Sequence, residues 1–532
     1  MPLRLTSVVT NIREFDPMHT SPFPTVEIPN EPVTPFVLRL AEVLADHPAM
    51  IDGPTGRTYT YAQLADGTKR VAGWLAARGF GRGDVLGILL PNIPEYFLVF
   101  HGAATVGGTV TTINPTYGPD EVAFQLQDAG ATLLVTIPMF VETAVKAAEN
   151  TAVTDIVMIG DTDSHIPFSE LMTADPFEGH APVDVADDVV VLPYSSGTTG
   201  LPKGVMLTHR NLTANMAQTQ HILQVAEGVE RVIAVLPFFH IYGMQVLMNN
   251  VIQRGGTVVT MPRFDLAEFL RILQDQAITI AYLVPPIVLA LAKHPMVADY
   301  DLSSLRLIFS GAAPLSGELA DEARERLGVA VVQGYGMTEL SPVTHSTPEG
   351  SYNPASVGFT ISNTETRIVE PATGEDLETG ADGEVWIRGP QVMKGYLNNP
   401  GATAAMIDSE GWLRTGDIGH FDSDGFLYIV DRLKELIKYK GFQVPPAELE
   451  GVLLTHPAIS DAAVIGIPDE EAGEIPKAFV VTAPDSNLTA EDVMTFVGDH
   501  VAAYKKVRVV EFIDAIPKSA SGKILRRELR NL

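Results

Sequence analysis

The most informative segment of this 532-residue chain is YSSGTTGLPKG, at residues 194–204, which follows a β-branched run. Its eleven positions hold four serine or threonine hydroxyls, three glycines and one lysine. Glycines let backbone amides approach an anion, the hydroxyls add hydrogen-bond donors and the lysine adds positive charge. The loop therefore suits a triphosphate, although it lacks the G-x-x-x-x-G-K-[ST] spacing of a Walker A loop. A flexible surface loop of the same composition is the alternative.

Strand-like and helix-like segments alternate around this loop. Amphipathic patterns predict helices at residues 266–276 and 316–328, and β-branched runs predict strands at residues 185–196, 231–239, 255–261, 278–284 and 305–311. This alternation indicates parallel sheets covered by helices. After about residue 355 the pattern changes to short strands separated by Gly and Asp, which predicts an antiparallel or barrel-like section.

The last hundred residues differ in charge from the rest of the chain. Residues 432–532 carry 13 basic and 15 acidic side chains, whereas residues 1–431 carry 23 basic and 50 acidic ones. Strand-like runs such as AFVVTAP alternate there with helical patterns such as PPAELEGVLLTH, which predicts a small α+β domain. The predicted fold is an α/β protein. Its large N-terminal body, at residues 1–431, combines parallel-rich sheets, covering helices and a barrel-like β section; a small C-terminal domain follows at residues 432–532.

The composition excludes several classes of protein. A net charge of −29 argues against binding to nucleic acid or to anionic membranes. The absence of cysteine excludes a disulfide scaffold, a cysteine nucleophile, an iron–sulfur cluster and cysteine-ligated zinc. The N-terminus lacks the basic start and apolar core of a signal peptide, and the apolar stretch around residues 85–100 is interrupted by Pro91 and Pro94. We expect a cytoplasmic enzyme without a membrane span.

Five further motifs follow the loop, and together they resemble the adenylate-forming superfamily. They are GYGMTE at residues 334–339, WLRTGD at 412–417, DRLKELIK at 431–438, YKGFQV at 439–444 and SGKILR at 521–526. This superfamily contains acyl-CoA synthetases, 4-coumarate–CoA ligases, luciferases and the adenylation domains of peptide synthetases. The resemblance runs from about residue 30 to the end of the chain, which looks most similar to bacterial members of the 4-coumarate–CoA ligase group.

The resemblance implies a two-step reaction that uses ATP, Mg²⁺ and coenzyme A. A carboxylate attacks the α-phosphate of MgATP to give an acyl-adenylate and pyrophosphate, and the thiol of coenzyme A then displaces AMP. Because two anions meet in the first step, fixed cations and donors must surround the phosphorus. By resemblance, Thr338 donates to the α-phosphate, Glu339 helps to hold magnesium, and Lys523 bridges the α-phosphate and the substrate carboxylate. The β- and γ-phosphates are assigned to Ser195, Ser196, Gly197, Thr198, Thr199 and Lys203.

The nucleoside half of ATP is assigned by the same resemblance. Asp417 is expected to accept hydrogen bonds from the ribose hydroxyls, as a carboxylate does in dinucleotide folds, and Arg432 to reach the ribose. Tyr335 is expected to stack on adenine, and Ala312, Gln333 and Gly334 match other positions of the nucleotide pocket. The alternatives are that Tyr335 is a core residue, Glu339 a helix cap and Lys523 part of a solvated helix start.

The second step needs other groups near the same phosphorus. In the family the C-terminal domain rotates after adenylation, and Lys434 matches the hinge position. Lys438, Lys440, Gly441 and Gln443 match positions that contact the adenylate or coenzyme A, and Arg263 matches a basic residue at a coenzyme A phosphate site. The solvated face of a strand is the alternative for these clustered cations.

The acid-binding pocket is assigned from the segment LPFFHIYGM and from the ends of later strands. A lone histidine after an apolar strand is usually a core residue, but His240 resembles the gating or substrate-contacting histidine of 4-coumarate–CoA ligases. Small residues leave room for a flat ring, and Tyr242 offers a hydroxyl or a π-face. The positions matched to this pocket are Tyr242, Gly243, Met244, Val246, Gly311, Ala313, Gly334, Pro342 and Val343.

We therefore predict an AMP-forming acid–thiol ligase, a monomer or homodimer, that acts on 4-coumarate or related phenylpropanoid acids. A medium-chain fatty acyl-CoA ligase shares every catalytic motif, and only the pocket lining separates the two. A luciferase-like enzyme and a carrier-protein-directed adenylating enzyme are further alternatives. A non-catalytic nucleotide-binding regulator is disfavoured because it would be expected to lose Lys523, Glu339 or Asp417.

Overall fold

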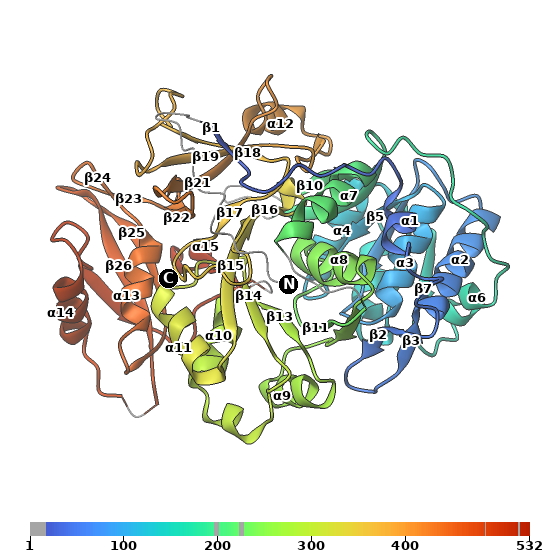
Figure 1. Ribbon diagram of the computed structural model, residues 1–532, viewed down its shortest axis with the longest axis horizontal. Helices are drawn as coiled ribbons and strands as arrows, with labels where there is room; N and C mark the ends of the chain where they lie inside the picture. The colour runs from blue at the N-terminus through green and yellow to red at the C-terminus, as the bar shows by residue number, and fades with distance from the viewer. Residues whose placement is uncertain (1–17, 196–201, 223–227, 485, 520–521) are drawn as a thin grey trace.

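The computed structural model describes residues 18–195, 202–222, 228–484, 486–519 and 522–532. Three sheets build the larger part of the molecule and a fourth sheet builds its C-terminal part (Figure 1). The predicted α/β class is confirmed. Residues Ser196, Gly197, Thr198 and Thr199 of the predicted phosphate loop lie outside the described residues.

The first large sheet carries the start of the phosphate loop. It consists of β4 (Val85–Leu89), β5 (Thr109–Thr112), β6 (Ala131–Thr136), β7 (Asp155–Met158), β8 (Ile166–Pro167), β9 (Val189–Ser195), β10 (Lys203–Thr208) and β20 (Gly395–Tyr396). Their spatial order is β20-β10-β9-β5-β4-β6-β7-β8. Pairing is parallel from β9 to β8 and antiparallel among β9, β10 and β20. Lys203 pairs with Ser195 across β9 and β10, so the two described ends of the loop are neighbours.

The second large sheet contains the four strands predicted between residues 231 and 311. It consists of β2 (Pro48–Asp52), β3 (Thr58–Thr60), β11 (Arg231–Ala234), β12 (Thr257–Thr260), β13 (Ile280–Leu283), β14 (Leu307–Ser310), β15 (Ala330–Gly336), β16 (Val343–Ser346) and β17 (Phe359–Thr360). Their order is β17-β16-β15-β14-β13-β11-β12-β2-β3, parallel from β15 to β2. Parallel pairing requires a crossover between successive strands, and the helical segments of this region supply it.

Helices cover these two sheets. They are α1 (Val33–Val37), α2 (Tyr61–Ala77), α3 (Glu95–Thr105), α4 (Pro119–Ala129), α5 (Val141–Ala148), α6 (Phe168–Met172), α7 (His209–Gln218), α8 (Asn250–Gln253), α9 (Leu266–Asp275), α10 (Pro285–Lys293) and α11 (Gly317–Leu327). Both predicted helices are confirmed as α9 and α11. The Asp265 side chain caps α9 and the Ser316 side chain caps α11, each by accepting a hydrogen bond from a backbone N–H of the first turn. Among the described residues, no helix has the length and apolar character needed to cross a membrane.

The predicted antiparallel section forms the third sheet, which Figure 1 shows above the other two, in orange except for the blue strand β1. It consists of β1 (Met18–Thr20), β18 (Glu365–Val369), β19 (Gly383–Arg388), β21 (Leu413–Phe421) and β22 (Leu427–Arg432), in that spatial order, with α12 (Pro400–Met406) nearby. The barrel-like reading is wrong in one respect. Within the described part of the chain this sheet stays open, because β1 and β22 are its two edges and do not pair. Alternating patterns alone do not distinguish an open sheet from a closed one.

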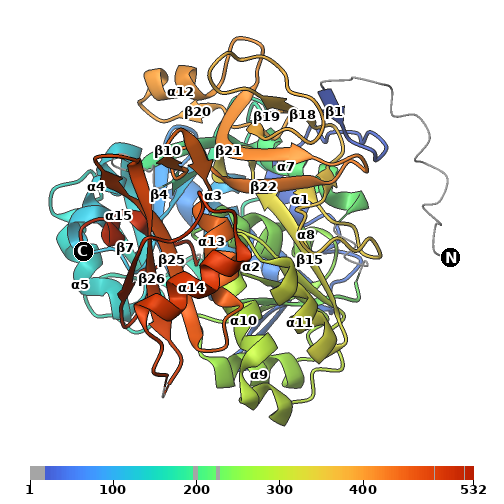
Figure 2. The same cartoon turned by 90° about the vertical axis from the view of Figure 1, so that its left-hand side faces the viewer.

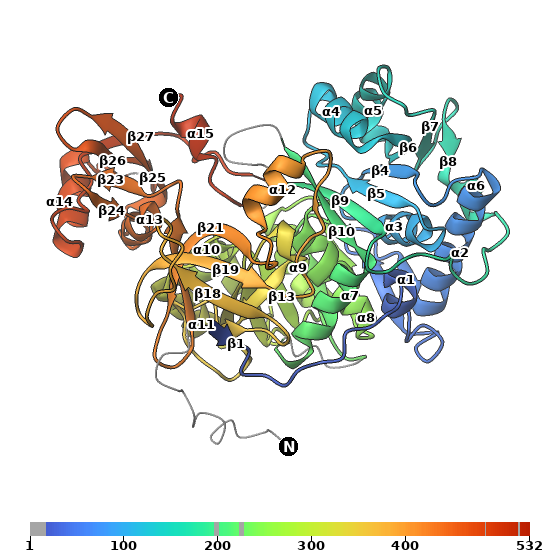
Figure 3. The ribbon, with the colours of Figure 1, turned by 90° about the horizontal axis from the view of Figure 1, so that it is seen from above.

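The fourth sheet belongs to the C-terminal part, which Figures 1 and 3 both place at one end of the molecule. It consists of β23 (Ile437–Tyr439), β24 (Phe442–Val444), β25 (Ile459–Asp469), β26 (Gly473–Thr482) and β27 (Val509–Phe512). The helices are α13 (Pro446–Leu454), α14 (Ala490–His500) and α15 (Arg526–Leu529). Figure 2 looks onto this part, with α13 and α14 in front.

Side chains alternate across β25 and so divide the C-terminal core between the two faces of its sheet. Ala462 and Val464 pack with residues of α13 and α14, whereas Ala463 and Ile465 pack with Leu529 of α15. These clusters contain no residue before Ile437. The α15 face therefore carries the segment with Lys523, and the sheet between the two faces fixes where that segment can lie.

Candidate active site

The candidate site lies where the parallel strands of the second sheet end. In open α/β sheets, ligands bind outside the carboxyl ends of such strands. Val284, Gly311 and Tyr335 are at or just beyond the ends of β13, β14 and β15. The third sheet contributes Asp417 and Arg432, and the C-terminal part contributes Lys523. Three separate parts of the molecule therefore contribute to this site.

Asp417 is the centre of a buried polar cluster. It accepts a hydrogen bond from the Tyr335 hydroxyl at 2.5 Å, and Arg432 Nε lies 3.3 Å from its other carboxylate oxygen. Its backbone N–H donates to Thr415 Oγ1, which itself donates to Val385 O. Burial raises the pKa of Tyr335 well above its usual value, and the charge of Asp417 adds to the effect. The tyrosine is therefore a neutral donor, and the carboxylate is held rigidly by two elements.

A second cluster surrounds Glu339, which is buried in the short 3₁₀-helix η5 (Thr338–Leu340). Glu339 Oε1 accepts hydrogen bonds from Ser195 Oγ at 3.1 Å and from the Tyr396 hydroxyl at 2.8 Å. Lys203 Nζ lies 4.4 Å from the centroid of the Tyr396 ring. The described ends of the phosphate loop and the predicted magnesium ligand are thus in contact, and Thr338 is buried beside them. This arrangement presents a cation, a hydroxyl and a carboxylate together.

Lys523 reaches the site on a tight loop. Ser519 and Lys523 exchange hydrogen bonds, N–H to carbonyl at 2.8 Å and N–H to Oγ at 3.2 Å. Gly522 has φ +78°, and a Cβ there would lie 3.3 Å from Val284 Cγ2. Glycine is therefore needed both for the turn and for the close contact with the end of β13. The contact docks the lysine loop on the N-terminal body.

Lys523 lies among charged groups of both the N-terminal body and the C-terminal part. Burial lowers the pKa of Lys523 to about 8, and repulsion by Arg432 lowers it further, whereas Asp417 and Glu435 oppose the shift. Burial likewise lowers the pKa of His240 to about 4, with the charge of Lys523 as the second cause. His240 is therefore neutral near pH 7, and it lies close enough to the predicted catalytic lysine to be affected by its charge.

The lowered pKa of Lys523 predicts the alkaline limb of the pH–rate profile. The lysine acts as a cation, so its contribution is complete below its pKa and is lost as the pH rises through about 8. We expect kcat/KM for pyrophosphate release to fall by about tenfold per pH unit above that point, because kcat/KM reports the free enzyme. In Lys523→Arg this limb should move to higher pH, since a guanidinium stays charged. An unchanged limb in Lys523→Arg would assign it to another group.

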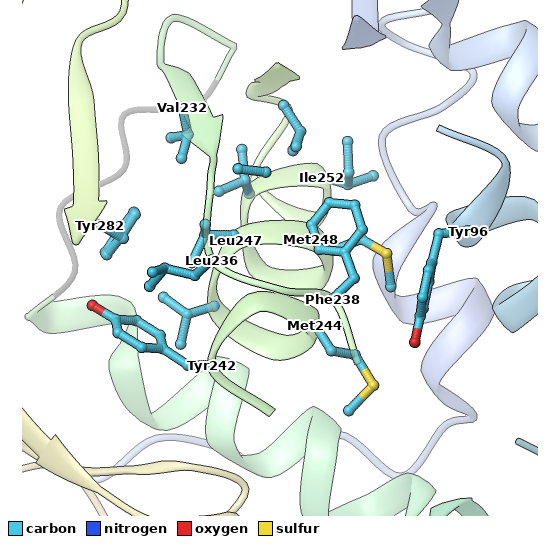
Figure 4. Close-up of a cluster of buried hydrophobic side chains, with 14 of the residues drawn as sticks. Tyr96, Val232, Leu236, Phe238, Tyr242, Met244, Leu247, Met248, Ile252 and Tyr282 are labelled. Carbon is cyan, nitrogen blue, oxygen red and sulfur yellow. The ribbon is translucent and has the colours of Figure 1, made fainter. Parts of the chain in front are cut away.

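The predicted acid pocket is built around the π-helix η3 (Tyr242–Asn249), a rare element that is frequent at functional sites. Figure 4 shows Tyr242 in the buried cluster formed by β11, β13 and η3. Its ring meets the end of β14, because a Cβ on Gly311 would lie 3.1 Å from Tyr242 Cε1. Met244, Val246, Pro342 and Val343 are buried, Gly243 packs on the carbonyl of Pro237, and Ala313 is half-buried.

Three further residues were predicted for the nucleotide pocket, and the structure shows the surroundings of each. The Gln333 amide accepts from the Leu315 N–H and donates to Leu315 O and Pro354 O, so it clamps two loops together. Ala312 is exposed, with φ 70°. Gly334 leaves room for the Phe309 ring, because a Cβ there would lie 2.4 Å from it. The nucleotide-binding role of these three residues stays a prediction.

The structure does not bring the residues predicted for the second step into this site. Lys438, Lys440, Gly441 and Gln443 are exposed on the β23–β24 hairpin, and β24 is an edge strand. The Lys438 N–H donates to Glu474, and Lys440 forms an ion pair with Glu471. Lys434 is exposed between β22 and β23, and Arg263 is exposed between β12 and α9.

Sequence reasoning missed Tyr396. This residue is buried, and its hydroxyl also lies 2.8 Å from Met406 Sδ. It is 57 positions from Glu339, and no periodicity or charge pattern in KGYLNNP marks it. Only the pairing of β20 with β10 places the Tyr396 ring beside Lys203, and this pairing cannot be read from the sequence.

The chain matches two protein families and is similar to several named enzymes. It matches the AMP-binding enzyme family over residues 38–397 and the AMP-binding enzyme C-terminal domain over residues 448–523. It is 45% identical over 523 residues to 4-coumarate–CoA ligase 3 of Oryza sativa subsp. japonica, which covers 96% of this chain and 94% of that protein. It is 43% identical over 540 residues to the 4-coumarate–CoA ligase of Pinus taeda, covering 98% of this chain and 99% of that one.

A solved structure is similar over almost the whole length. The anthranilate CoA ligase AuaEII, crystallised with anthranoyl-AMP, superposes with a TM-score of 0.88 at 27% sequence identity. The match covers 96% of this chain and 98% of that one. The fold similarity therefore includes the C-terminal part that carries Lys523.

Proposed function

The chain belongs to the AMP-binding enzyme family, and from this membership we propose that it is an ATP-dependent, AMP-forming acid–CoA ligase acting on 4-coumarate or a related aryl-propenoic acid. The observation that carries the proposal is identity of 45% along nearly the full length of a 4-coumarate–CoA ligase. The same reaction is supported by the influence of Asp417 on Lys523 and by the contact of Glu339 with Ser195 at the start of the phosphate loop.

In the first step this chain's residues bring two anions together. Lys523 would hold the substrate carboxylate and the α-phosphate, and its ammonium would offset the charge that builds on phosphorus. Asp417 would accept both ribose hydroxyls, while Tyr335 and Arg432 hold the carboxylate in place. Lys203 and the hydroxyls of the phosphate loop would hold the pyrophosphate leaving group. Neutral His240 would border the acid beside Lys523.

Magnesium fits at Glu339, although the carboxylate could not bind it alone. The described residues contain no group of three or more His, Asp or Glu side chains able to hold a metal ion. Mg²⁺ commonly binds through one or two carboxylates together with substrate phosphates and water, so a single buried glutamate suits it. When bound with ATP, the ion supplies charge neutralisation of the triphosphate. Ser195 and Tyr396 hold the carboxylate for that purpose.

In the second step residues 432–532 would rotate about Lys434, so that the β23–β24 hairpin replaces the Lys523 segment at the site. The present arrangement suits adenylation, because Lys523 is docked and the β23–β24 hairpin is exposed. Rotation would withdraw Lys523 and bring Lys438, Lys440, Gly441 and Gln443 toward the adenylate, with Arg263 available to a phosphate of coenzyme A. A loop residue such as Lys434 can take up the required backbone change.

Pyrophosphate release with ATP and magnesium tests the function and the acid together. We expect rapid, coenzyme A-dependent turnover with 4-coumarate and at least tenfold lower kcat/KM with octanoate, because a flat ring suits the wall formed by Tyr242 and Gly311. Each acid is compared with and without coenzyme A. A preference for octanoate would replace the substrate by a medium-chain fatty acid and keep the mechanism. Turnover that needs a carrier protein instead of coenzyme A would contradict the ligase assignment.

A cytoplasmic location and a monomeric or homodimeric state complete the proposal. The charge balance and the N-terminal sequence support the first. Light scattering coupled to size-exclusion chromatography, with 57.3 kDa expected for a monomer, tests the second.

A further inference from the structure

Tyr396 contacts both charged side chains that we assign to the triphosphate and its magnesium. Its hydroxyl donates to Glu339 Oε1 at 2.8 Å, and Lys203 Nζ lies over its ring at 4.4 Å from the centroid. The sequence motifs leave this residue without a role. A single side chain therefore links the cation at one end of the phosphate loop to the carboxylate beside the other end.

The backbone around Tyr396 holds it in one position. Tyr396 pairs with Val205 across β20 and β10, and the N–H of Leu397 donates to Gly204 O at 2.8 Å. The Tyr396 N–H donates to Thr403 Oγ1 at 2.9 Å. The side chain is 5% exposed. These backbone contacts fix Tyr396 on β10, the strand that follows the phosphate loop and begins with Lys203.

The chemistry of both contacts suits the support of a metal–phosphate site. The Tyr396 hydroxyl is the donor in its contact with Glu339, because an ionised carboxylate can only accept. A hydrogen bond to a carboxylate is charge-assisted and fixes its orientation. Both hydrogen bonds that the Glu339 carboxylate receives from the described residues end on Oε1, which leaves Oε2 for a cation. The aromatic face attracts the Lys203 ammonium without neutralising it.

We propose that Tyr396 is a positioning residue for MgATP, whose hydroxyl orients Glu339 toward magnesium and whose ring holds Lys203 beside the β- and γ-phosphates. This inference rests on the proposed ligase function and deepens it. The two contacts act on different parts of the ligand, so they can be removed separately. Tyr396→Phe keeps the ring and loses the hydroxyl, whereas Tyr396→Leu loses both.

The test measures magnesium dependence. Pyrophosphate release is titrated with Mg²⁺ at fixed ATP, and MgATP binding is measured by calorimetry without any acid. For Tyr396→Phe we expect the half-saturating Mg²⁺ concentration to rise about tenfold, the size expected for one lost charge-assisted hydrogen bond. For Tyr396→Leu we expect the same rise together with weaker ATP binding, by a further factor of about five.

Tyr59→Phe is the matched control, because Tyr59 also donates to a buried glutamate, Glu95 Oε1 at 3.1 Å, outside the candidate site. Its Mg²⁺ titration should equal that of the wild type. A Tyr396→Phe protein with a lower melting temperature and an unchanged Mg²⁺ titration would reduce Tyr396 to a packing role and overturn the inference. If the wild type binds MgATP but activates no acid, the ligase proposal fails, and the calorimetric titrations still decide the role of Tyr396.

Discussion

Lys523→Ala is expected to slow acyl-adenylate formation by about 10²–10³-fold, the usual cost of removing one group that stabilises transition-state charge. The reason lies in the geometry. Gly522 docks the loop on Val284, and the ammonium stands in the fields of Asp417, Arg432 and His240. No other assigned cation is shared by the acid and the α-phosphate. The measurement is single-turnover pyrophosphate release with ATP and 4-coumarate.

The same variant should convert supplied acyl-adenylate and coenzyme A into thioester at close to the wild-type rate. The two half-reactions should respond differently because, after the C-terminal part rotates, Lys523 no longer lies in the site during thioester formation. Lys440→Ala should show the opposite pattern, with normal adenylation and slow thioester formation, since Lys440 is exposed in the present arrangement. Arg527→Ala, which removes an exposed cation four positions from Lys523, is the control. Equal loss of both half-reactions in Lys523→Ala would contradict the rotation.

The sequence predicted the strands well because their runs are locally strong. The β-branched run at residues 185–196 became β9, and the runs at residues 231–239 and 305–311 became β11 and β14. Closure of the antiparallel section could not be predicted in the same way. Whether the edge strands β1 and β22 meet depends on how far the sheet curls, and this is a property of the whole sheet.

The site residues, too, can be predicted from local motifs, whereas their contacts with distant parts of the chain cannot. The motifs predict Asp417, Tyr335 and Lys523 as site residues, but the hydrogen bond from Tyr335 to Asp417 joins residues 82 positions apart. Gln333 was assigned to the nucleotide, whereas its amide is engaged by Leu315 and Pro354, partners that no motif contains. Whether the hairpin residues Lys438 and Gln443 reach the site depends on which face of the C-terminal part is docked there. Only one face can be docked at a time, so these residues and Lys523 cannot occupy the site together.

Asp417→Ala is expected to raise the KM for ATP by about 10²-fold or more, because two hydrogen bonds from ribose hydroxyls to a charged group are lost together. The loss should be larger than for an exposed carboxylate, since Asp417 is buried and the variant leaves the Tyr335 hydroxyl and the Arg432 guanidinium without their acceptor. Asp417→Asn keeps the shape of the side chain but loses its charge, so its KM for ATP should lie between those of the wild type and Asp417→Ala. The measurement is the ATP dependence of pyrophosphate release.

Deoxy-ATP analogues test directly whether Asp417 contacts the ribose hydroxyls, because they separate a lost contact from a general effect on folding. The wild type should use 2′-deoxy-ATP and 3′-deoxy-ATP at least tenfold less efficiently than ATP, whereas Asp417→Ala should treat the three nucleotides nearly alike, because the acceptor that distinguishes them is gone. Asp422→Asn is the matched control: Asp422 also accepts a tyrosine hydroxyl, from Tyr428 at 3.2 Å, but in the turn between β21 and β22. Full retention of ribose discrimination in Asp417→Ala would place the ribose elsewhere, and would leave the Tyr335–Asp417–Arg432 cluster as a brace between two sheets.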